Sequence, residues 1–407
     1  MLSPEYLARI EEGSEEIASQ LHTYIIRHII DRMMIRIGRG YDYLLTSSDR
    51  WRIQILQDAG YLLEDITAEL SKYTKRQEKE IKAAMEEAGI KALEYDHKIY
   101  EAAGLSPMPL TQSPALIRLM ERNYRATLGE WNNYTRTTAE AAQRLFLNEC
   151  DLAYNKVLSG AVSYSRAVKE AVDNVVSGGV IVQYPSGHKD TIETATARAV
   201  RTGVAQATGD ISIKRMEEMN WDIILVSAHI GARTGDGGQN PGNHLWWQGQ
   251  FYSRTGSDRR FPPFSQTGYG TGEGLCGWNC RHSFGSGDGV NNPYKDIQTA
   301  DNYKVEQLEK RQRTLERRIR KTKREVMGMQ EAVDKCKDEP AKFEMQLELD
   351  RKSYLLHRQN KAYNEFCKTN DLRTQQERLQ IARWNREQAA KARGAARRYQ
   401  NAKGKKE

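Results

Sequence analysis

A long stretch without proline most constrains what this chain can fold into. No proline lies between Pro4 and Pro107, so that stretch can form long helices. Apolar residues recur there at helical spacing, and one stripe is formed by Tyr6, Ile10, Ile17, Leu21, Ile25, Ile29 and Met33. The stretch "GRGYDYLLTSSDRW" should break the helix, and "TSSD" can cap the next one at Trp51.

The helical pattern runs to Ala103, where Gly104 is an expected C-cap. The stretch "LSPMPLTQSP" packs three prolines into ten residues and predicts a loop. Helical spacing returns from Pro114 to Val176, with a break expected at Gly160. Residues 1–176 are therefore predicted to form a mostly helical domain.

A different pattern begins at residue 177. "SGGVIVQYPSG" predicts a strand or hairpin arm, a helix follows from about Asp190 to Met219, and "WDIILVSAH" predicts a second strand. These elements indicate a strand–helix–strand unit. Residues 227–292 then hold 15 of the 31 glycines but also three of the seven tryptophans, which is unlike a linker and indicates an ordered loop region. Residues 177–292 are predicted to be a small central α/β domain.

Helical pattern resumes after Pro293 with "VEQLEKRQRTLERRIRKTKREV" and a second arm near Ala341 to Ala389, separated by "KDEP". The last residues, "RGAARRYQNAKGKKE", look frayed and basic. Residues 293–407 are therefore predicted to be a basic helical, coiled-coil-like arm. The expected fold class is α+β.

The net charge of +8 is unevenly distributed along the chain. Residues 301–407 hold 29 Lys and Arg against 17 Asp and Glu, a balance of +12, whereas the remainder has 33 against 37, a balance of −4. This asymmetry favours an acidic partner, of which nucleic acid is the commonest.

Other features of the chain exclude several protein classes. No apolar run approaches the ~18 residues of a membrane helix, so no membrane partner is expected. The N-terminus "MLSPEYLARIEEGSEE" lacks the pattern of a signal peptide. Five cysteines are few and odd in number, which argues against a disulfide framework and favours assembly in a reducing cytoplasm.

The stretch "GLCGWNCRH" contains candidate metal ligands. Cys276, Cys280 and His282 lie close in sequence, and His229 or His244 could complete the four N or S ligands that zinc prefers. The alternative is a structural turn in which small Cys and Gly residues let Trp278 pack tightly. Zinc is thus the only cofactor that the sequence suggests, and both interpretations stay open.

A catalytic centre is less well supported by the sequence. A metal nuclease could combine the three loop histidines with Asp236, Asp258 or Asp288, but no two histidines have i,i+4 spacing and no carboxylate pair flanks them. "GYGTGEG" meets neither the dinucleotide fingerprint nor the P-loop pattern. We therefore assign no catalytic residue and expect no small-molecule substrate.

Two further groups of residues are candidates for binding. Residues 311–324 carry eight basic side chains against one acid, and phosphates could be met by Arg313, Arg317, Arg320, Lys321 and Arg324. The alternative is a solvated helix or contact with an acidic protein. Large aromatic residues suited to a protein interface are Trp246, Trp247, Phe251, Tyr269 and Trp278, and their alternative is a local core.

The motifs "VSAHIGAR", "HLWWQGQ" and "TGYGTGEGLCGWNCRHSFGSGDG", in this order, resemble the phage minor capsid protein 2 family, which is similar to the Mu F-like head proteins of tailed bacteriophages. The resemblance covers roughly residues 1–330 and is strongest over 179–292, although the run between Arg233 and His244 is longer than in the family. It implies a low-copy, non-enzymatic virion protein, made in the host cytoplasm and located in the capsid interior or at the portal vertex.

The resemblance also implies partners and roles. The expected partners are the portal protein, other head proteins and double-stranded DNA, and the expected roles are head assembly, DNA packaging or DNA ejection. Two alternatives remain: a metal-dependent DNA-acting enzyme that uses the His/Cys loop cluster, and a generic DNA-bridging coiled-coil protein.

Overall fold

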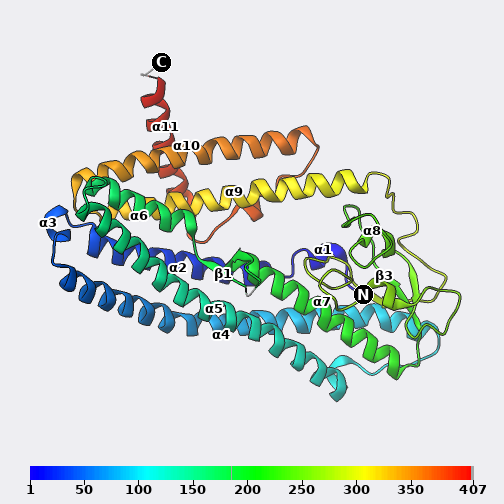
Figure 1. Cartoon of the computed structure of the whole chain (residues 1–407). Coiled ribbons are helices and arrows are strands. Elements are labelled where there is room, and N and C mark those ends of the chain that lie inside the picture. Colours follow the sequence, from blue (N-terminus) through cyan, green and yellow to red (C-terminus); the bar gives the residue numbers. More distant parts are fainter. Residues whose placement is uncertain (185, 405–407) are drawn as a thin grey trace. The chain divides into compact units, whose positions relative to one another are not determined.

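The computed structural model describes residues 1–184 and 186–404 and is mostly helical (Figure 1). The helices are α1 (Pro4–Leu7), α2 (Glu12–Ile37), α3 (Tyr41–Leu44), α4 (Ser48–Ala102), α5 (Pro114–Leu158), α6 (Tyr164–Gly178), α7 (Ile192–Glu218), α8 (His244–Trp247), α9 (Asn302–Lys335), α10 (Glu339–Thr369) and α11 (Arg386–Gly404). Short 3-10 turns are η1 (Leu110–Gln112), η2 (Phe264–Thr267) and η3 (Gln376–Leu379). Within the described residues, none of the helices has a segment apolar and long enough to span a membrane.

The strands form two small antiparallel sheets. β1 (Ile181–Gln183) pairs with β2 (Lys189–Thr191) as a hairpin, and β3 (Ile223–Val226) is the central strand between β4 (Phe251–Ser253) and β5 (Phe284–Ser286). The predicted α+β fold class is confirmed. The predicted strand–helix–strand unit is wrong in one respect, because the strands before and after α7 belong to separate sheets.

Local signals placed the N-terminal helices well. The stripe residues Ile17, Leu21, Ile25, Ile29 and Met33 are all buried. Trp51 donates its backbone N–H to the carbonyl of Ser47 at the start of α4, at 2.8 Å. Gly104 and Gly160 follow α4 and α5 with φ of +78° and +68°, as expected for glycines that end helices.

The described residues group into two compact units, and each unit is assembled from three segments. Unit 1 combines Met1–Glu15, Thr74–Asn133 and Thr194–Lys310, and unit 2 combines Glu16–Tyr73, Tyr134–Glu193 and Arg311–Glu407. These units differ from the sequence ranges 1–176, 177–292 and 293–407, because α4, α5 and α9 each contribute residues to both units.

In unit 1, a core of α-helical and loop residues surrounds the three-stranded sheet. Aromatic side chains of the loop region form much of this core, and the buried set includes Trp247, Tyr252, Phe264 and Phe284. The first turn of α9 is tied to the loop region, because the Asn302 side chain accepts the backbone N–H groups of Gly231 and Ala232 at 2.8 and 2.9 Å. The loop region is therefore ordered, as its aromatic content predicts.

In unit 2, helix α9 is packed against other helices rather than projecting as a separate arm. Gln312 near one end of α9 meets Tyr363 of α10, and Glu325 meets Lys352, so the two helices run antiparallel. Lys352 is buried and also pairs with Asp173 of α6 at 2.7 Å. The two long helices predicted for residues 293–407 are therefore present as an antiparallel pair, and several buried positions of α9 carry paired charges.

The predicted second arm, Ala341 to Ala389, is two helices in the structure. α10 ends at Thr369 and α11 begins at Arg386. α11 packs on α10, where Arg398 donates to Asp350 at 2.7 Å and the rings of Tyr354 and Tyr399 lie 5.3 Å apart. The predicted frayed tail is thus helical up to Gly404, and its last three residues lie outside the described part. Coiled-coil geometry stays a prediction.

A buried ion pair anchors α9 within unit 2. Arg324 donates to Glu193 at 2.5 Å, and His22 meets the same carboxylate at 2.9 Å. The second ring nitrogen of His22 accepts the backbone N–H of Val180 at 3.1 Å, so Nδ1 carries the hydrogen that faces Glu193. Burial alone would raise the pKa of Glu193, but the charge of Arg324 and the hydrogen bond from His22 outweigh it and hold the pKa well below its usual range.

Replacing Arg324 should therefore destabilise the fold. Arg324→Gln leaves a buried carboxylate short of its main counter-charge, and we expect a loss of about 3–5 kcal/mol in the free energy of unfolding at pH 7. Because the folded pKa of Glu193 is depressed, the stability from this pair is present above the pKa of an unfolded Glu, ~4.3, and is lost as the pH falls below it. The difference in the free energy of unfolding between variant and wild type should narrow as the pH falls below about 4.

Denaturant unfolding at several pH values checks this expectation. Arg317→Gln is the matched control, because Arg317 is exposed on the same helix. It should change stability by less than about 0.5 kcal/mol. Equal effects of the two substitutions at pH 7 would contradict the structural role of Arg324.

Candidate functional site

The candidate site lies in the ordered loop region of unit 1. His244 opens the short helix α8, where the Asn243 side chain caps the N–H of Trp246 at 3.3 Å. Cys280 and His282 lie on the segment that leads into β5. This segment is held to the end of β3 by Ser227 and Ser283, which exchange bonds of 2.9 Å. A short helix and a strand edge thus bring together residues 36 positions apart.

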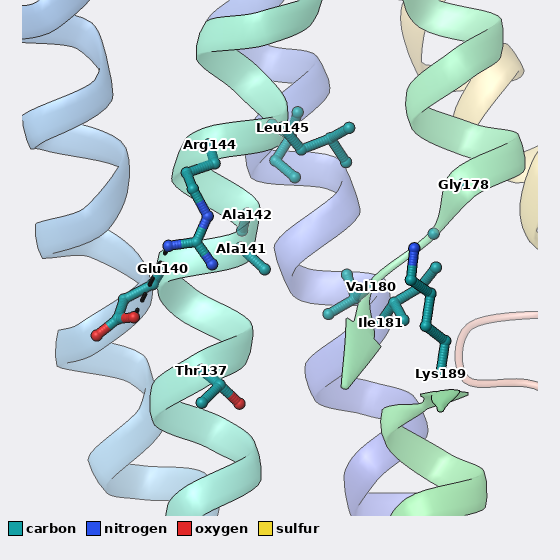
Figure 2. Close-up of a pocket in the computed structure, with 12 residues that line it drawn as sticks. Thr137, Glu140, Ala141, Ala142, Arg144, Leu145, Gly178, Val180, Ile181 and Lys189 are labelled. Carbon is teal, nitrogen blue, oxygen red and sulfur yellow. Dashed lines mark ion pairs between the residues drawn. The ribbon is translucent and has the colours of Figure 1, made fainter. Parts of the chain in front are cut away.

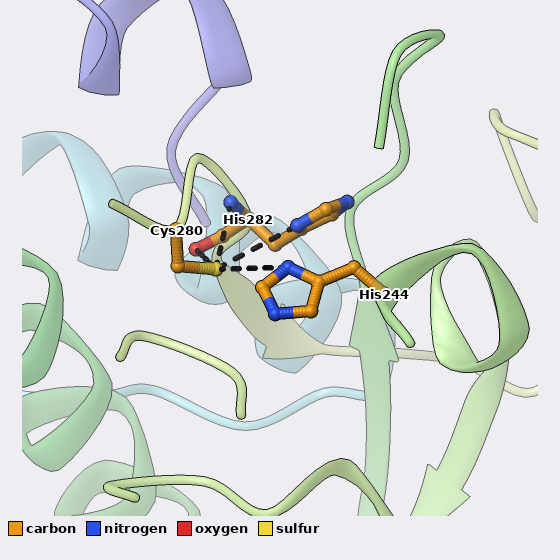
Figure 3. Close-up of side chains that lie close together, drawn as sticks. All are labelled: His244, Cys280 and His282. Carbon is orange, nitrogen blue, oxygen red and sulfur yellow. Dashed lines mark hydrogen bonds between the residues drawn. The ribbon is translucent and has the colours of Figure 1, made fainter. Parts of the chain in front are cut away.

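Three side chains converge at this place, as Figure 3 shows. The Sγ atom of Cys280 lies 3.8 Å from Nδ1 of His244 and 3.6 Å from Nδ1 of His282. All three residues are buried, with 2%, 2% and 1% of their surface exposed for His244, Cys280 and His282. We call these three residues the His/Cys cluster.

The outward nitrogens of both imidazoles are fixed by oxygen acceptors. Nε2 of His244 lies 2.8 Å from the carbonyl oxygen of Glu273, and Nε2 of His282 lies 2.8 Å from Oε1 of Gln248. The same Oε1 accepts the backbone N–H of His229 at 3.1 Å, which identifies it as the oxygen of the amide. Both Nε2 atoms therefore carry hydrogens, and both Nδ1 atoms present lone pairs.

Burial sets the protonation of the His/Cys cluster. It lowers the pKa of His244 to about 4 and lowers the pKa of His282 well below its usual value, aided there by the neighbouring histidines and by Arg281 and Arg233. Burial also raises the pKa of the Cys280 thiol. Both imidazoles are therefore neutral at pH 7, which is the form that binds metal ions.

Two other predicted ligands lie beside the cluster but not in it. Cys276 is buried, and its Sγ faces the carbonyl oxygen of His282 at 3.8 Å. Its φ of +58° and the φ of +56° at Asn279 make tight turns, so the segment is not the helix that would align both cysteines. The His229 ring stacks on His282 at 4.5 Å, while its Nδ1 bonds the carbonyl of Ile230 at 2.9 Å.

The aspartates of the nuclease alternative each stabilise their own turn. Asp236 accepts from Gly238 and Asn240, and Asp258 pairs with Arg260 at 2.6 Å. Asp288 accepts the backbone N–H groups of Val290 and Asn291. The cluster found among residues 1–184 and 186–404 contains no carboxylate. The turn at Asp236 lies within the run between Arg233 and His244, and His244 reaches Cys280.

The predicted interface aromatics divide into core and surface. Trp247 is fully buried, and its Nε1–H donates to the carbonyl of Pro241 at 2.9 Å. Its prediction as an interface anchor is therefore wrong, because its side chain packs in the core of unit 1. Trp246, Phe251 and Tyr269 are partly buried. Trp278 is 59% exposed and remains available to a partner.

Several of the predicted phosphate contacts on α9 serve packing within unit 2. Arg324 is committed to Glu193, and Arg320 donates to the carbonyl of Arg378 at 2.8 Å. Arg313 is partly buried, whereas Arg317 and Lys321 are exposed. Arg324 is thus a structural residue, because its guanidinium neutralises a buried carboxylate.

Sequence reasoning gave too little weight to α11. This helix carries the exposed basic residues Arg386, Arg393, Arg397 and Lys403. Its alanines, of which Ala392, Ala395 and Ala396 are buried, make only a weak apolar stripe, so the sequence predicts a frayed tail where the structure has a helix. The i,i+3 and i,i+4 spacing of those alanines was the signal that could have identified the helix.

A hollow of about 390 Å³ lies in unit 2 (Figure 2). It is formed by α2, α5 and the residues around the β1–β2 hairpin, and its polar rim includes the pair Glu140–Arg144 and Lys189. None of the predicted site residues lines it. The hollow and the His/Cys cluster are therefore separate features, and the cluster is the better candidate site.

Fold and site together define a predominantly helical protein that buries a His/Cys cluster in a glycine- and aromatic-rich loop region. The family model described as phage minor capsid protein 2 matches residues 2–388, and the chain belongs to this family. Membership makes it a phage minor capsid protein and a component of the virion, with other phage head proteins as its partners. Searches of curated proteins and of solved structures gave no match.

Stability measurements should separate the two tryptophans that differ most in burial. Trp247→Ala removes a fully buried ring, and we expect it to lower the free energy of unfolding by about 3–5 kcal/mol. Trp278→Ala should change it by less than about 0.5 kcal/mol, because the ring is mainly in solvent. Thermal unfolding of the two purified variants checks this, and a large loss for Trp278→Ala would show that its ring supports the fold.

Proposed function

We propose that the protein is an architectural, non-enzymatic head component that binds the portal protein or a neighbouring head protein through the surface around Trp278. The exposed Trp278 ring carries this proposal, because its loop is held rigidly. Its backbone N–H donates to Gly272 at 2.7 Å, and Arg233 donates to its carbonyl at 2.6 Å. A rigid, exposed tryptophan loses little conformational entropy on binding and is a frequent interface anchor.

Glycine at position 272 supports this arrangement. A Cβ atom added to Gly272 would lie 2.9 Å from the Trp278 ring, so the ring rests directly on the glycine backbone. The ring is thus supported on one face and open to solvent on the other. Such a surface can meet a partner without rearranging the loop.

An architectural role is also favoured by where the His/Cys cluster lies. Its three side chains are almost completely buried, so a nucleic-acid backbone has no direct access to them. Metal-dependent cleavage of DNA needs an ion that contacts the phosphate or the attacking water. The burial of the cluster therefore supports a structural rather than a catalytic role.

We further propose that the protein meets the packaged genome through α11. The exposed residues Arg386, Arg393, Arg397 and Lys403 give this helix a basic surface. Contact with phosphates there would be independent of DNA sequence and sensitive to salt. Within unit 2, α9 also carries exposed basic residues, which are Arg311, Arg317, Arg318 and Lys321.

Changing Trp278 should impair entry into heads without unfolding the protein. With Trp278→Ala we expect at least a severalfold fall in copies per virion, because the interface loses its aromatic anchor. Quantitative mass spectrometry of purified particles measures the copies, and circular dichroism confirms folding. Tyr303→Ala is the control, since Tyr303 is 65% exposed in the same unit. Normal incorporation of the Trp278 variant, or equal loss with Tyr303→Ala, would refute the interface.

Removing the exposed charges of α11 should weaken binding to every DNA equally. The variant with Gln at Arg386, Arg393, Arg397 and Lys403 should reduce the slope of log K against log salt by about 0.9 for each phosphate that the helix no longer neutralises. The control removes four exposed charges from unit 1, at Arg118, Arg259, Lys295 and Lys304. Fluorescence anisotropy with two unrelated duplexes measures the slopes.

Three outcomes would count against these assignments. Binding indifferent to salt, or an equal slope change in the control, would remove α11 as the DNA-binding surface. A separate assay tests for nuclease activity: plasmid DNA incubated with the protein and Mg²⁺ or Zn²⁺ should stay intact. Cleavage that disappears with His282→Ala would instead support the metal-dependent enzyme.

A further inference from the structure

Two imidazole nitrogens of the His/Cys cluster carry lone pairs that point at a single thiol. His244 and His282 each use Nε2–H for an oxygen acceptor, so each aims a bare Nδ1 at the Sγ of Cys280. A thiol has one hydrogen and can satisfy only one of them. The backbone N–H of His282 also points at this sulfur, at 3.3 Å, and would remain as a donor to the sulfur of a cation-bound thiolate. A buried acceptor left without a donor costs about 1–3 kcal/mol.

A cation at the centre of the three atoms removes this conflict. It would accept both Nδ1 lone pairs and the thiolate sulfur at once. We propose that His244, Cys280 and His282 bind one structural zinc ion, which orders the loop region of unit 1. This proposal does not depend on the proposed role in the head.

The two sulfur–nitrogen distances are close to those of a zinc site. Zn–S bonds of about 2.3 Å and Zn–N bonds of about 2.0 Å, at a tetrahedral angle, place sulfur and nitrogen about 3.5–3.6 Å apart. The two Sγ–Nδ1 distances are 3.6 and 3.8 Å. Thiolate and imidazole are donors that select zinc over magnesium or calcium.

The surroundings of the cluster are also those of a metal site. Histidines that bind metals commonly donate their other ring N–H to a carbonyl or carboxylate, which fixes the tautomer. Here Glu273 and Gln248 supply such oxygens at 2.8 Å. Three protein ligands leave the fourth coordination position to a small ligand such as water, because Cys276 lies outside the group.

The ion would link parts of the loop region that little regular structure connects. His244 belongs to α8, whereas Cys280 and His282 precede β5. Between them lie the tight turns at Gly274 and Gly277, where an added Cβ would meet backbone oxygens at 2.2 and 2.3 Å. Tethering both ends of this segment would fix the loop that carries Trp278.

Metal content of the purified full-length protein tests the proposal directly. We expect about one zinc per chain by elemental analysis after removal of loosely bound ions, since the part of the chain that the structure describes contains one cluster of three ligands. Cobalt exchanged into the protein should give a thiolate-to-metal charge-transfer band. Wild-type protein that is folded and contains no zinc, and that shows no such band with cobalt, would overturn the proposal.

Two cysteine variants provide a matched comparison. Cys280→Ser should lose the zinc and the cobalt band, whereas Cys276→Ser should keep both, although the two cysteines are equally buried in the same loop. Circular dichroism of both variants establishes that they fold. If Cys280→Ser does not fold, then His244→Ala serves in its place. Loss of zinc in Cys276→Ser, or its retention in a folded Cys280→Ser, would refute this ligand set.

Gln248 offers a test of the supporting shell. Gln248→Ala removes the acceptor that orients His282 and should weaken zinc binding by about 10- to 100-fold, as measured by competition with a chelator. Gln248→Glu keeps an acceptor oxygen and should restore most of the affinity. If both variants bind zinc as wild type does, then His282 is not held as a ligand in this way.

Discussion

The loop region between β3 and α9 has little regular secondary structure, so the hydrogen bonds of its backbone and polar groups must come from other partners. The geometry of the candidate site depends on these hydrogen bonds. Glycines at 274 and 277 bring chain segments so close that no side chain would fit. Asn302 and Gln248 then supply the hydrogen bonds that strands or helices supply elsewhere. The packing of Trp247 and the convergence of the His/Cys cluster both follow from this folded loop.

Charge plays two different roles in unit 2. On α9, Arg324 pairs with the carboxylate of Glu193, and Glu325 pairs with Lys352. These ion pairs offset the free-energy cost of removing the charges from water. On α11, Arg386, Arg393, Arg397 and Lys403 are exposed, whereas Arg398 pairs with Asp350. The net charge of +12 in residues 301–407 therefore comes partly from side chains that are paired in the interior and partly from side chains on the surface. Only the surface part, on α11 and on the exposed side of α9, is available to phosphates.

Rigidity connects the proposed interface with the proposed metal site. Trp278 lies two residues before Cys280, and its carbonyl is held by Arg233. A loop fixed at Cys280 and His282 would present the Trp278 ring in one orientation to a head protein. An assembly component benefits from such an arrangement, because less conformational entropy is lost when the partner binds. The burial of the cluster and the exposure of its neighbouring tryptophan are thus compatible parts of one architectural role.

The sequence by itself determined the local structure. Helical periodicity, Ser47, Gly104 and Gly160 identified most of the N-terminal helices and their ends, because caps and stripes act over a few residues. Composition also indicated that the loop region is ordered, and its motifs indicated the family.

Only the tertiary structure decided which role each residue has within those elements. Trp246 and Trp247 are neighbours, yet only Trp247 is fully buried. Cys276 and Cys280 are four apart, yet only Cys280 meets two histidines. The spacing of Arg324 predicts a phosphate contact, whereas in the structure Arg324 pairs with Glu193. Each of these outcomes depends on partners distant in sequence, and spacing along the chain carries no information about them.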